Sequence, residues 1–591
     1  MKKIFGFTFL LFFGVLYSQN EQIANNYFDR GDFEKAMISY EDLLKSQPNN
    51  FNYFNRLVEC YQQMKQYDKA QTAIISRLEK YKSPIFMIEL GYNYQLMKEE
   101  VSAKRNYQEA IDLISVDPNS VYSIASSFEK KFLTDYALQA YQAALDKDPK
   151  MNFNYQMALL YGQKADFDKM IEMFLDESER NPQSLIMIQN QFSRFMTDDA
   201  SETFNDSLKK ALLLRTQKSQ DVYWNQYLSW FFVQNKEYGK AFIQEKAIYK
   251  RNSESLSNIV NLAQLAIDEK ESETATEILS FVLENTQDED LKIKAHSYLM
   301  EMKIKNAQAK DYPAITTELD NLVKQFGIVP QNLDIILQKA HFTAFQLKNP
   351  EAAKNLLKQV IELKLNREQM ATAKMELADI LLLEEKFNQA LLYYSQIEVD
   401  NPGVNIGQEA SLKIAKTSYF QNDFNWAQKQ LGVLKSANSQ LIANDAMDLF
   451  LLIQDNSVED STQVAIKKFA KADYYIYQDK KLEAIEALKN LLKEHKEDKI
   501  VPVTLLRLGK LYESQNDTTT ALAYYKQILD EHKDCIYIDE ALYFSGLLYM
   551  NTNDTEKAKT VFEQVIMNHP DSIYYVESQK RYRKLRGDKE L

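Results

Sequence analysis

Glycine and proline are scarce in this sequence of 591 residues, which contains 13 glycines and 11 prolines. Soluble proteins usually contain about 7% glycine and about 5% proline. Architectures rich in β-turns need more glycine than this, because glycine adopts left-handed turn conformations without steric cost. Alanine, leucine, lysine, glutamate and glutamine are plentiful, and these residues favour helices. The composition therefore predicts a helical protein, and the chain is too long for a single compact core.

Cysteine and histidine are also rare, with two and five copies. Cys60 and Cys535 are far apart in the sequence, so we expect no disulfide between them. The histidines lie in different segments and have no His or Cys partner at ligand spacing, which argues against a metal site. The common phosphate-binding, dinucleotide-binding, serine-hydrolase and zinc-protease motifs are missing. We therefore expect no catalytic residues, no cofactor and no metal.

Positive charge is in deficit. The chain has 71 Lys and Arg residues against 84 Asp and Glu residues, which gives a formal net charge of −13. An acidic chain has no general attraction for phosphate backbones, so we expect no nucleic-acid partner.

The N-terminus carries an apolar run at residues 4–17, which follows Lys2 and Lys3 and precedes the small residue Ser18. A membrane helix needs about 20 apolar residues, and this run is shorter. The pattern predicts an export signal over residues 1–18, with a retained membrane anchor as the alternative. Loss of the two lysines changes the formal charge from −13 to −15.

The signal resembles those of Bacteroidota, which implies the periplasm or cell envelope of a Gram-negative bacterium. The apolar run is not followed by the cysteine that a lipid-anchored protein requires. We therefore expect a soluble exported protein without a transmembrane span after signal removal.

A spaced pattern recurs through the rest of the chain. The stretch NNYFDRGDFEKAMISYEDLLKSQPNN at residues 25–50 contains Gly31, Phe33, Ala36, Tyr40 and Pro48 at offsets that return after 33–37 residues. Such self-similarity is the signature of stacked helical hairpins. The most regular position is that of Ala36. Its counterparts are Ala70, Ala103, Ala137, Met170, Ala241, Ala275, Ala353, Ala390, Ala427, Ala484, Ala521 and Ala558.

A second small residue recurs in the first helix of each unit, as at Gly91 and Gly509. It allows the second helix to approach closely, and a bulky residue there should cost about 1–3 kcal/mol by overpacking. The pattern resembles the tetratricopeptide repeat, a helix–turn–helix of about 34 residues, in about thirteen units. The resemblance implies an all-α, right-handed superhelical solenoid in which each hairpin buries its apolar face on its neighbours.

The regular and irregular parts of the pattern predict the domain organisation. After the signal at 1–18 we expect an N-terminal array at 19–182, an irregular helical unit at 183–220, a repeat pair at 221–286, an irregular helix pair at 287–327, a repeat array at 328–436, an unpaired helix and linker at 437–460, a C-terminal array at 461–572 and a basic capping helix at 573–591. An odd helix interrupts a two-helix rhythm, so we predict a break or bend at 437–460.

The resemblance also implies which positions of the first helices line the concave side of the repeats. These positions are Ile88, Tyr92, Tyr122, Tyr155, Gln226, Trp230 and Tyr543. Aromatic side chains there could hold an extended peptide or a helix of a partner, because they give a large contact area at little loss of rotamer freedom. The alternative is that they pack against neighbouring repeats.

The sequence therefore favours a non-catalytic scaffold for a protein or peptide partner whose identity it does not reveal. About 20 residues follow the last repeat, too few for a catalytic domain, so we expect no enzyme activity. The C-terminal repeats at 539–572 are similar to those of envelope-assembly proteins, so a role in outer-membrane protein insertion or in coordinating wall synthesis with division is the alternative. An enzyme acting on wall polymer is a third hypothesis. The sequence does not indicate which oligomeric state the protein adopts.

Overall fold

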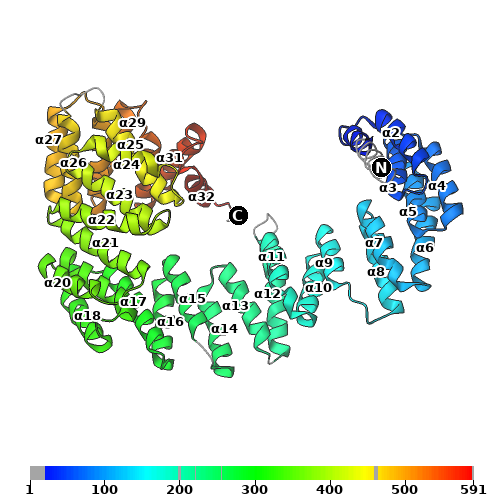
Figure 1. Ribbon diagram of the computed structural model, residues 1–591, viewed down its shortest axis with the longest axis horizontal. Coiled ribbons are helices and arrows are strands. Elements are labelled where there is room, and N and C mark those ends of the chain that lie inside the picture. Colours follow the sequence, from blue (N-terminus) through cyan, green and yellow to red (C-terminus); the bar gives the residue numbers. More distant parts are fainter. Residues whose placement is uncertain (1–19, 197–200, 220, 254–255, 458–462, 589–591) are drawn as a thin grey trace, which may run out of the picture. The chain divides into compact units, whose positions relative to one another are not determined.

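The computed structural model describes residues 20–196, 201–219, 221–253, 256–457 and 463–588. Helices joined by short turns make up these described residues, and no strand occurs among them. The chain divides into two compact units, residues 1–218 and 219–591. Within each unit helix follows helix as a series of hairpins (Figure 1). The predicted all-α solenoid of helical hairpins is confirmed. The predicted export signal at 1–18 lies outside the described residues.

Unit 1 begins with a helical segment at residues 20–29. Its further α-helices are α2 (Phe33–Ser46), α3 (Phe51–Gln63), α4 (Tyr67–Tyr81), α5 (Pro84–Leu96), α6 (Glu100–Asp112), α7 (Val121–Lys130), α8 (Thr134–Lys147), α9 (Asn154–Gln163), α10 (Phe167–Arg180), α11 (Leu185–Met196) and α12 (Ser201–Lys218). Neighbouring helices such as α5 and α6, or α9 and α10, pack along their length.

Unit 2 continues the series of hairpins. Its α-helices are α13 (Val222–Gln234), α14 (Tyr238–Arg251), α15 (Ser257–Asp268), α16 (Ser272–Asn285), α17 (Glu289–Lys305), α18 (Tyr312–Phe326), α19 (Leu333–His341), α20 (Pro350–Ile361), α21 (Arg367–Leu383), α22 (Phe387–Asp400), α23 (Asn405–Phe420), α24 (Phe424–Leu434), α25 (Gln440–Ser457), α26 (Val464–Tyr477), α27 (Lys481–Glu494), α28 (Val501–Ser514), α29 (Thr518–Glu531), α30 (Ile538–Asn551), α31 (Thr555–Asn568) and α32 (Tyr575–Arg586). None of the helices that the structure describes has both the length and the apolar character needed to cross a membrane.

Small residues allow the two helices of a hairpin to pack closely. A Cβ atom added to Gly91 would lie 2.5 Å from Cε1 of Tyr107 in the following helix. A Cβ atom added to Gly546 would lie 2.6 Å from the ring of Phe562. The repeated alanine is fully buried in the same interface, as at Ala558. The close approach expected from the sequence is therefore confirmed at these hairpins.

The turn inside the hairpins uses a left-handed backbone, mostly without glycine. Gly31 has φ = 78° in the first unit, and the corresponding residues Lys65, Lys98, Asn422 and Asn516 have φ between 59° and 64°. A left-handed conformation costs a residue with a side chain about 1–2 kcal/mol. Packing of the two helices must offset this cost in each repeat, and the arrangement explains how so many turns coexist with so little glycine.

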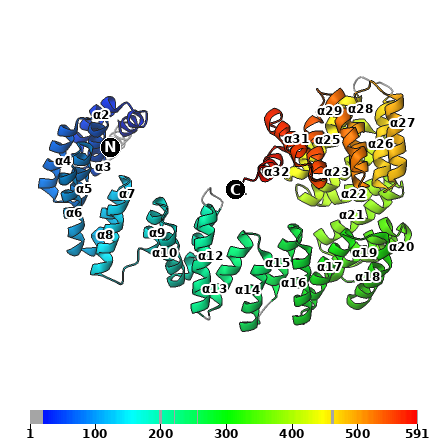
Figure 2. The same ribbon diagram turned by 180° about the vertical axis from the view of Figure 1, so that it is seen from behind.

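The helix α26 returns to a part of the chain that lies more than 90 residues earlier. The Tyr474 hydroxyl donates to the Leu382 carbonyl oxygen at 2.7 Å, and the Gln478 side chain donates to the Leu383 carbonyl oxygen at 3.0 Å. These carbonyls belong to the last turn of α21, where a helix leaves acceptors unsatisfied. The helix α25 packs on α24 and also contacts α23 and α26, and the two ribbon views agree with this placement (Figure 2).

These hydrogen bonds and the packing of α26 on α23 hold the first helix of the C-terminal repeats against α21 and α23. Residues 458–462 of the predicted linker lie outside the described part of the chain. The predicted division of the chain at 437–460 remains a prediction.

Removing the Tyr474 hydroxyl should loosen this return contact. We expect Tyr474→Phe to cost about 1–2 kcal/mol, because the hydroxyl no longer donates to the Leu382 carbonyl or accepts from the Gln478 side chain. Hydrogen exchange of the amides of α26 should then be at least about fivefold faster if local opening exposes them. Tyr475→Phe is the matched control, because no hydrogen bond of the Tyr475 hydroxyl occurs in the described structure. Equal exchange in the two variants would contradict the prediction.

Candidate partner-binding groove

The structure places the predicted partner-binding residues in different environments. Ile88 is fully buried in the core of unit 1, and Tyr543 is 8% exposed and stacks on Tyr574 with ring centroids 4.6 Å apart. These two side chains therefore belong mainly to the packing between helices. Tyr122 is 56% exposed and contacts the ring of Phe153 by its edge.

The other predicted residues are at least partly accessible. Gln226 is exposed, and Tyr92, Tyr155 and Trp230 are partly buried. The Lys131 ammonium lies 4.4 Å from the ring centroid of Tyr92. No ring contact or hydrogen bond within the described chain joins two of the seven predicted residues. Their role in binding a partner stays a prediction.

A continuous groove, which the sequence did not reveal, lies in unit 2. Two cavities of about 600 Å³ and 660 Å³ adjoin there and share Lys416, Phe420, Asp445 and Tyr477 in their walls. The walls come from α21, α23, α25, α26, α28 and α30, together with residues 439, 536–537 and 571–574. Each cavity lies within the range of about 300–1,000 Å³ that is common for ligand sites. We call the two together the charged groove.

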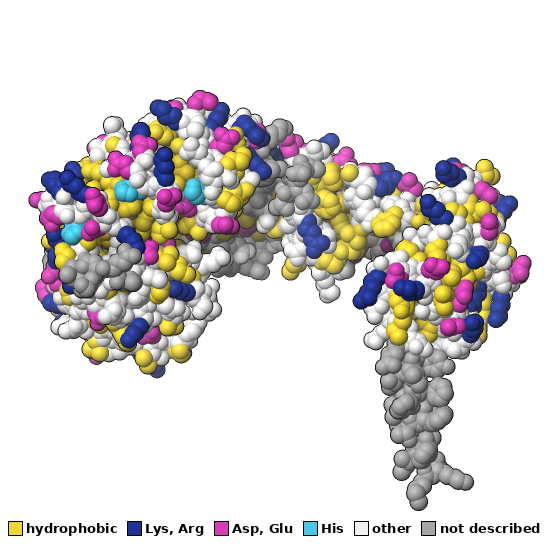
Figure 3. Space-filling view, turned by 90° about the horizontal axis from the view of Figure 1, so that it is seen from above, with side chains coloured by type: hydrophobic (Ala, Val, Ile, Leu, Met, Phe, Trp, Pro, Cys, Tyr) yellow, Lys and Arg dark blue, Asp and Glu magenta, His cyan; other side chains and the backbone are white. Residues whose placement is uncertain are grey.

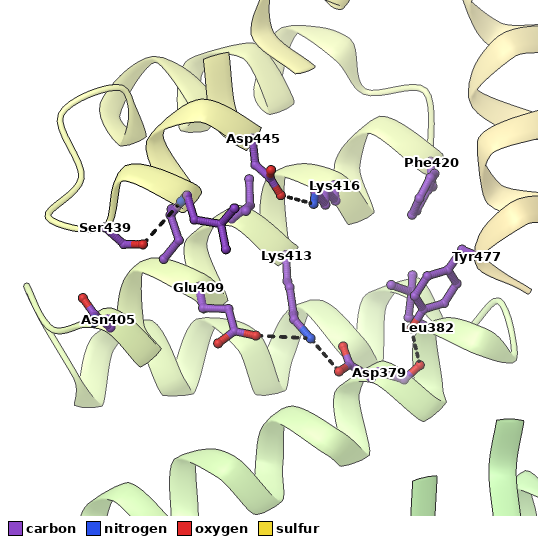
Figure 4. Close-up of a pocket in the computed structure, with 13 residues that line it drawn as sticks. Asp379, Leu382, Asn405, Glu409, Lys413, Lys416, Phe420, Ser439, Asp445 and Tyr477 are labelled. Carbon is purple, nitrogen blue, oxygen red and sulfur yellow. Dashed lines mark hydrogen bonds and ion pairs between the residues drawn. The ribbon is translucent and has the colours of Figure 1, made fainter. Parts of the chain in front are cut away.

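Ion pairs join α23 to α21 and to α25 along one end of the charged groove (Figure 4). Lys413 of α23 lies 2.6 Å from an Asp379 carboxylate oxygen of α21 and 3.6 Å from Glu409. Lys416, one turn further along α23, pairs with Asp445 of α25 at 3.1 Å. Burial alone would lower the pKa of Lys413, but the charge and hydrogen bond of Asp379 outweigh burial and raise this pKa. Both lysines are therefore already paired with carboxylates.

The same pairing continues at the other end of the groove. Asp473 of α26 lies 2.9 Å from Arg507 Nε of α28 and accepts a hydrogen bond from the Tyr419 hydroxyl at 3.1 Å. Burial raises the pKa of Asp473, and the Arg507 charge opposes this rise. Lys510, one turn beyond Arg507, pairs with Glu540 of α30. Arg507 and Lys510 are thus also matched by a carboxylate.

Carboxylates outnumber cations in the walls of the charged groove. The cations are Lys413, Lys416, Arg507 and Lys510, and the carboxylates are Asp379, Glu409, Asp445, Asp448, Asp473, Asp539, Glu540 and Asp571. Asp448, Asp539 and Asp571 form no ion pair with any described residue. Burial raises the pKa of Asp448, and the nearby charges of Glu540 and Asp445 raise it further. The groove therefore has a local excess of negative charge.

Apolar and aromatic side chains line the space between these charges. Phe420 and Tyr477 contact each other with ring centroids 6.0 Å apart at the junction of the two cavities. Ile536 and Ile573, in the wall of the larger cavity, are 57% and 67% exposed. Figure 3 shows the part of unit 2 that carries the histidines, drawn in cyan. Hydrophobic side chains there are intermingled with acidic and basic ones. The groove thus combines apolar contact area with carboxylates.

The hairpins define a class of protein, the solenoid of tandem helical repeats. Models of the tetratricopeptide repeat match residues 20–50, 504–534 and 540–572, so the chain contains repeats of this type. The last two matches cover α28 to α31, and α28 and α30 line the charged groove.

Similar solved structures are also known. One is the APC/C hetero-tetramer Cut9–Hcn1, with a TM-score of 0.25, 13% identity and 96% of each chain covered. Another is Naa15/Naa10 bound to HypK-THB, with a TM-score of 0.26, 12% identity, and 97% of this chain and 96% of that chain covered. A third is yeast Tom70, with a TM-score of 0.27, 14% identity, and 93% of this chain and 99% of that chain covered. A comparison with curated proteins finds no match.

Proposed function

We propose that this protein is a non-catalytic scaffold for protein–protein interactions, exported to the periplasm or cell envelope, which holds a peptide or helical segment of a partner. The charged groove carries this proposal, because a cavity of several hundred Å³ lies on the repeats themselves. Helices satisfy their own backbone groups, so side chains must supply the recognition. Stacked hairpins provide extended binding surfaces of this kind.

The export part of the proposal rests on residues 1–18. Lys2 and Lys3 precede a short apolar run there, as in secretory signals. Fractionation of cells that express the whole chain, followed by N-terminal sequencing of the mature protein, tests it. A mature chain that begins close to residue 19 in the periplasmic fraction supports export, and a full-length chain retained in the membrane contradicts it.

A first binding surface is proposed in unit 1 at Tyr122 and Tyr155. We expect the double variant Tyr122→Glu/Tyr155→Glu to reduce capture of a cross-linked envelope partner at least tenfold, because a single aromatic anchor often carries about 2 kcal/mol of binding energy and about 1.4 kcal/mol is tenfold. Quantitative mass spectrometry of the captured protein is the measurement. Val116→Glu is the control, because Val116 is 81% exposed in the same unit.

The outcomes of this experiment separate the surface from the scaffold. Unchanged capture by the tyrosine variant would reject this surface in unit 1. If the wild-type chain captures no protein after cross-linking in the envelope, the scaffold function itself is rejected.

From the resemblance that the sequence of residues 539–572 suggests to repeats of envelope-assembly proteins, we propose a narrower alternative. In this alternative the partner belongs to outer-membrane protein insertion or to the coordination of wall synthesis with division. Co-purification with outer-membrane or division proteins would favour it. An enzyme of wall polymer is the least favoured alternative, and the purified chain should show no turnover of peptidoglycan.

A further inference from the structure

We infer that the charged groove binds a basic, amphipathic segment of a partner protein. In this arrangement apolar side chains of the segment cover the floor of the groove, and its lysine or arginine side chains pair with Asp448, Asp539 and Asp571. The inference rests on the proposed scaffold function and assigns a ligand chemistry to one surface of it.

The pattern of ion pairs determines the charge of this ligand. Each cation in the walls already has a carboxylate partner from a neighbouring helix, as Arg507 has Asp473 and Lys416 has Asp445. An acidic segment would therefore meet no unpaired cation among the described residues of the walls. A segment with lysine or arginine would meet carboxylates that have no cation within 4.0 Å among the described residues. Asp448 and Asp571 are exposed and Asp539 is partly buried, so a ligand can reach all three, and a concave wall of one charge concentrates oppositely charged ligands.

The apolar walls determine the second property of the ligand. Ile536 and Ile573 are more than half exposed beside the aromatic rings of Tyr537 and Tyr574. A purely charged ligand would leave this apolar surface in contact with water. A purely apolar ligand would remove water from Asp448 and Asp571 without replacing it, and burying an uncompensated charge is costly. Only a segment with both kinds of side chain satisfies the whole groove.

A second copy of this chain fits the groove less well. The most basic segment of the described chain is α32, and its Tyr582 and Leu585 already pack against the core that contains Phe562. Val576 is the one large apolar side chain of this helix that is more than half exposed, so the helix has no continuous apolar face to place in another copy. The observations favour a segment of a different protein.

A defined peptide tests the inference on the full mature chain. The probe is a fluorescent, amphipathic helix of leucine and lysine, about 18 residues long, which spans about 27 Å. A peptide with glutamate in place of lysine and one with the same leucine and lysine residues in scrambled order are the comparison probes. Fluorescence anisotropy at about 0.15 M salt gives the dissociation constants, and salt at this level screens weak surface attraction.

The variants separate the groove from general attraction to an acidic protein. The groove variant is Asp448→Asn/Asp539→Asn/Asp571→Asn. The matched control is Glu273→Gln/Glu362→Gln/Glu483→Gln, which removes the same charge from exposed positions elsewhere in unit 2. We expect the groove variant to bind the leucine–lysine helix at least tenfold more weakly, and the control to change its affinity less than twofold. Bound peptide should slow hydrogen exchange in α25, α28 and α30.

Four results would overturn the inference. They are failure of the leucine–lysine helix to bind, equal binding by the two triple variants, equal binding of the glutamate peptide, and protection from exchange only outside the groove. Concentration-dependent self-association that only the groove variant abolishes would instead assign the groove to a second copy. None of these results rejects the scaffold, because capture of an envelope partner is measured independently.

Discussion

Gly509→Ala is expected to lower the free energy of unfolding of the C-terminal repeats by about 2 kcal/mol, within the usual cost of overpacking. A Cβ atom at this position would lie 2.2 Å from Cε1 and 2.7 Å from Cδ1 of Tyr525. The Tyr525 ring is fully buried, and its hydroxyl donates to Glu513 at 3.0 Å. The ring can therefore move away only if it gives up packing and this hydrogen bond.

Gly432→Ala provides the matched control for this prediction. Gly432 also lies inside a helix, α24, but the nearest atom to an added Cβ would be Phe450 Cε2 at 3.9 Å. Alanine should stabilise this helix by about 0.5–1 kcal/mol, because glycine loses more backbone entropy on folding. Urea unfolding followed by circular dichroism should thus show a lower free energy of unfolding for Gly509→Ala and a higher one for Gly432→Ala than for the wild type. Changes of the same sign and size in the two variants would mean that contact with Tyr525 does not restrict the size of the residue at position 509.

The same contact shows why the fold was predictable from the sequence. The small residue and the aromatic residue sixteen positions later, as in Gly509 and Tyr525, recur at Gly91 and Tyr107 and at Gly546 and Phe562 because these hairpins share one kind of interface. A pattern that recurs in many units is visible without knowledge of the structure. The turns were less visible, since residues such as Lys65 and Asn516 adopt the left-handed conformation that glycine has at Gly31.

The charged groove was not predictable from the same pattern. Its ion pairs do carry a signal, because Asp379 and Lys413, or Asp473 and Arg507, are 34 residues apart, about one repeat length. Opposite charges at this spacing lie side by side on equivalent helices of successive hairpins, as on α21 and α23 or on α26 and α28. The groove also depends on α26 packing on α21, through Tyr474 and Gln478. The helix α26 comes directly after the irregular segment around α25 in the sequence. The repeat period is interrupted there, so it does not predict which helices α26 contacts.

Lys131→Met is expected to destabilise unit 1 by about 3–5 kcal/mol at neutral pH, the usual cost of breaking a buried ion pair. Lys131 lies 2.8 Å from Glu89 of α5, and both side chains are only 9% exposed. The second carboxylate oxygen of Glu89 has no hydrogen-bond partner in the described structure. Methionine keeps the apolar part of the lysine side chain, so the loss should come from the unpaired Glu89 charge.

The pH dependence of this loss identifies its cause. Burial raises the pKa of Glu89 in the folded protein, and Lys131 opposes this rise. Removal of Lys131 should therefore raise the pKa of Glu89 further. Because this folded-state pKa exceeds the unfolded value of about 4.3, the folded state binds the proton more tightly. The unfolded state is common to the wild type and the variant, so the destabilisation must grow as the pH rises from the folded-state pKa of Glu89 in the wild type to its higher value in the variant. It must shrink at lower pH, where Glu89 is protonated in both folded proteins.

Two further variants complete the test of the buried pair. Glu89→Gln/Lys131→Met should recover most of the lost stability, since no charge is then left buried. Lys130→Met removes an exposed neighbouring lysine and should change the free energy of unfolding by less than about 1 kcal/mol. Urea unfolding of each variant at about pH 7 and about pH 4 is the measurement. Two outcomes would contradict the prediction: a loss of stability in Lys131→Met that does not depend on pH, or a loss that persists in the double variant. Either outcome would show that packing of the Lys131 side chain over the Tyr92 ring sets the stability of this hairpin, and not the charge of Glu89.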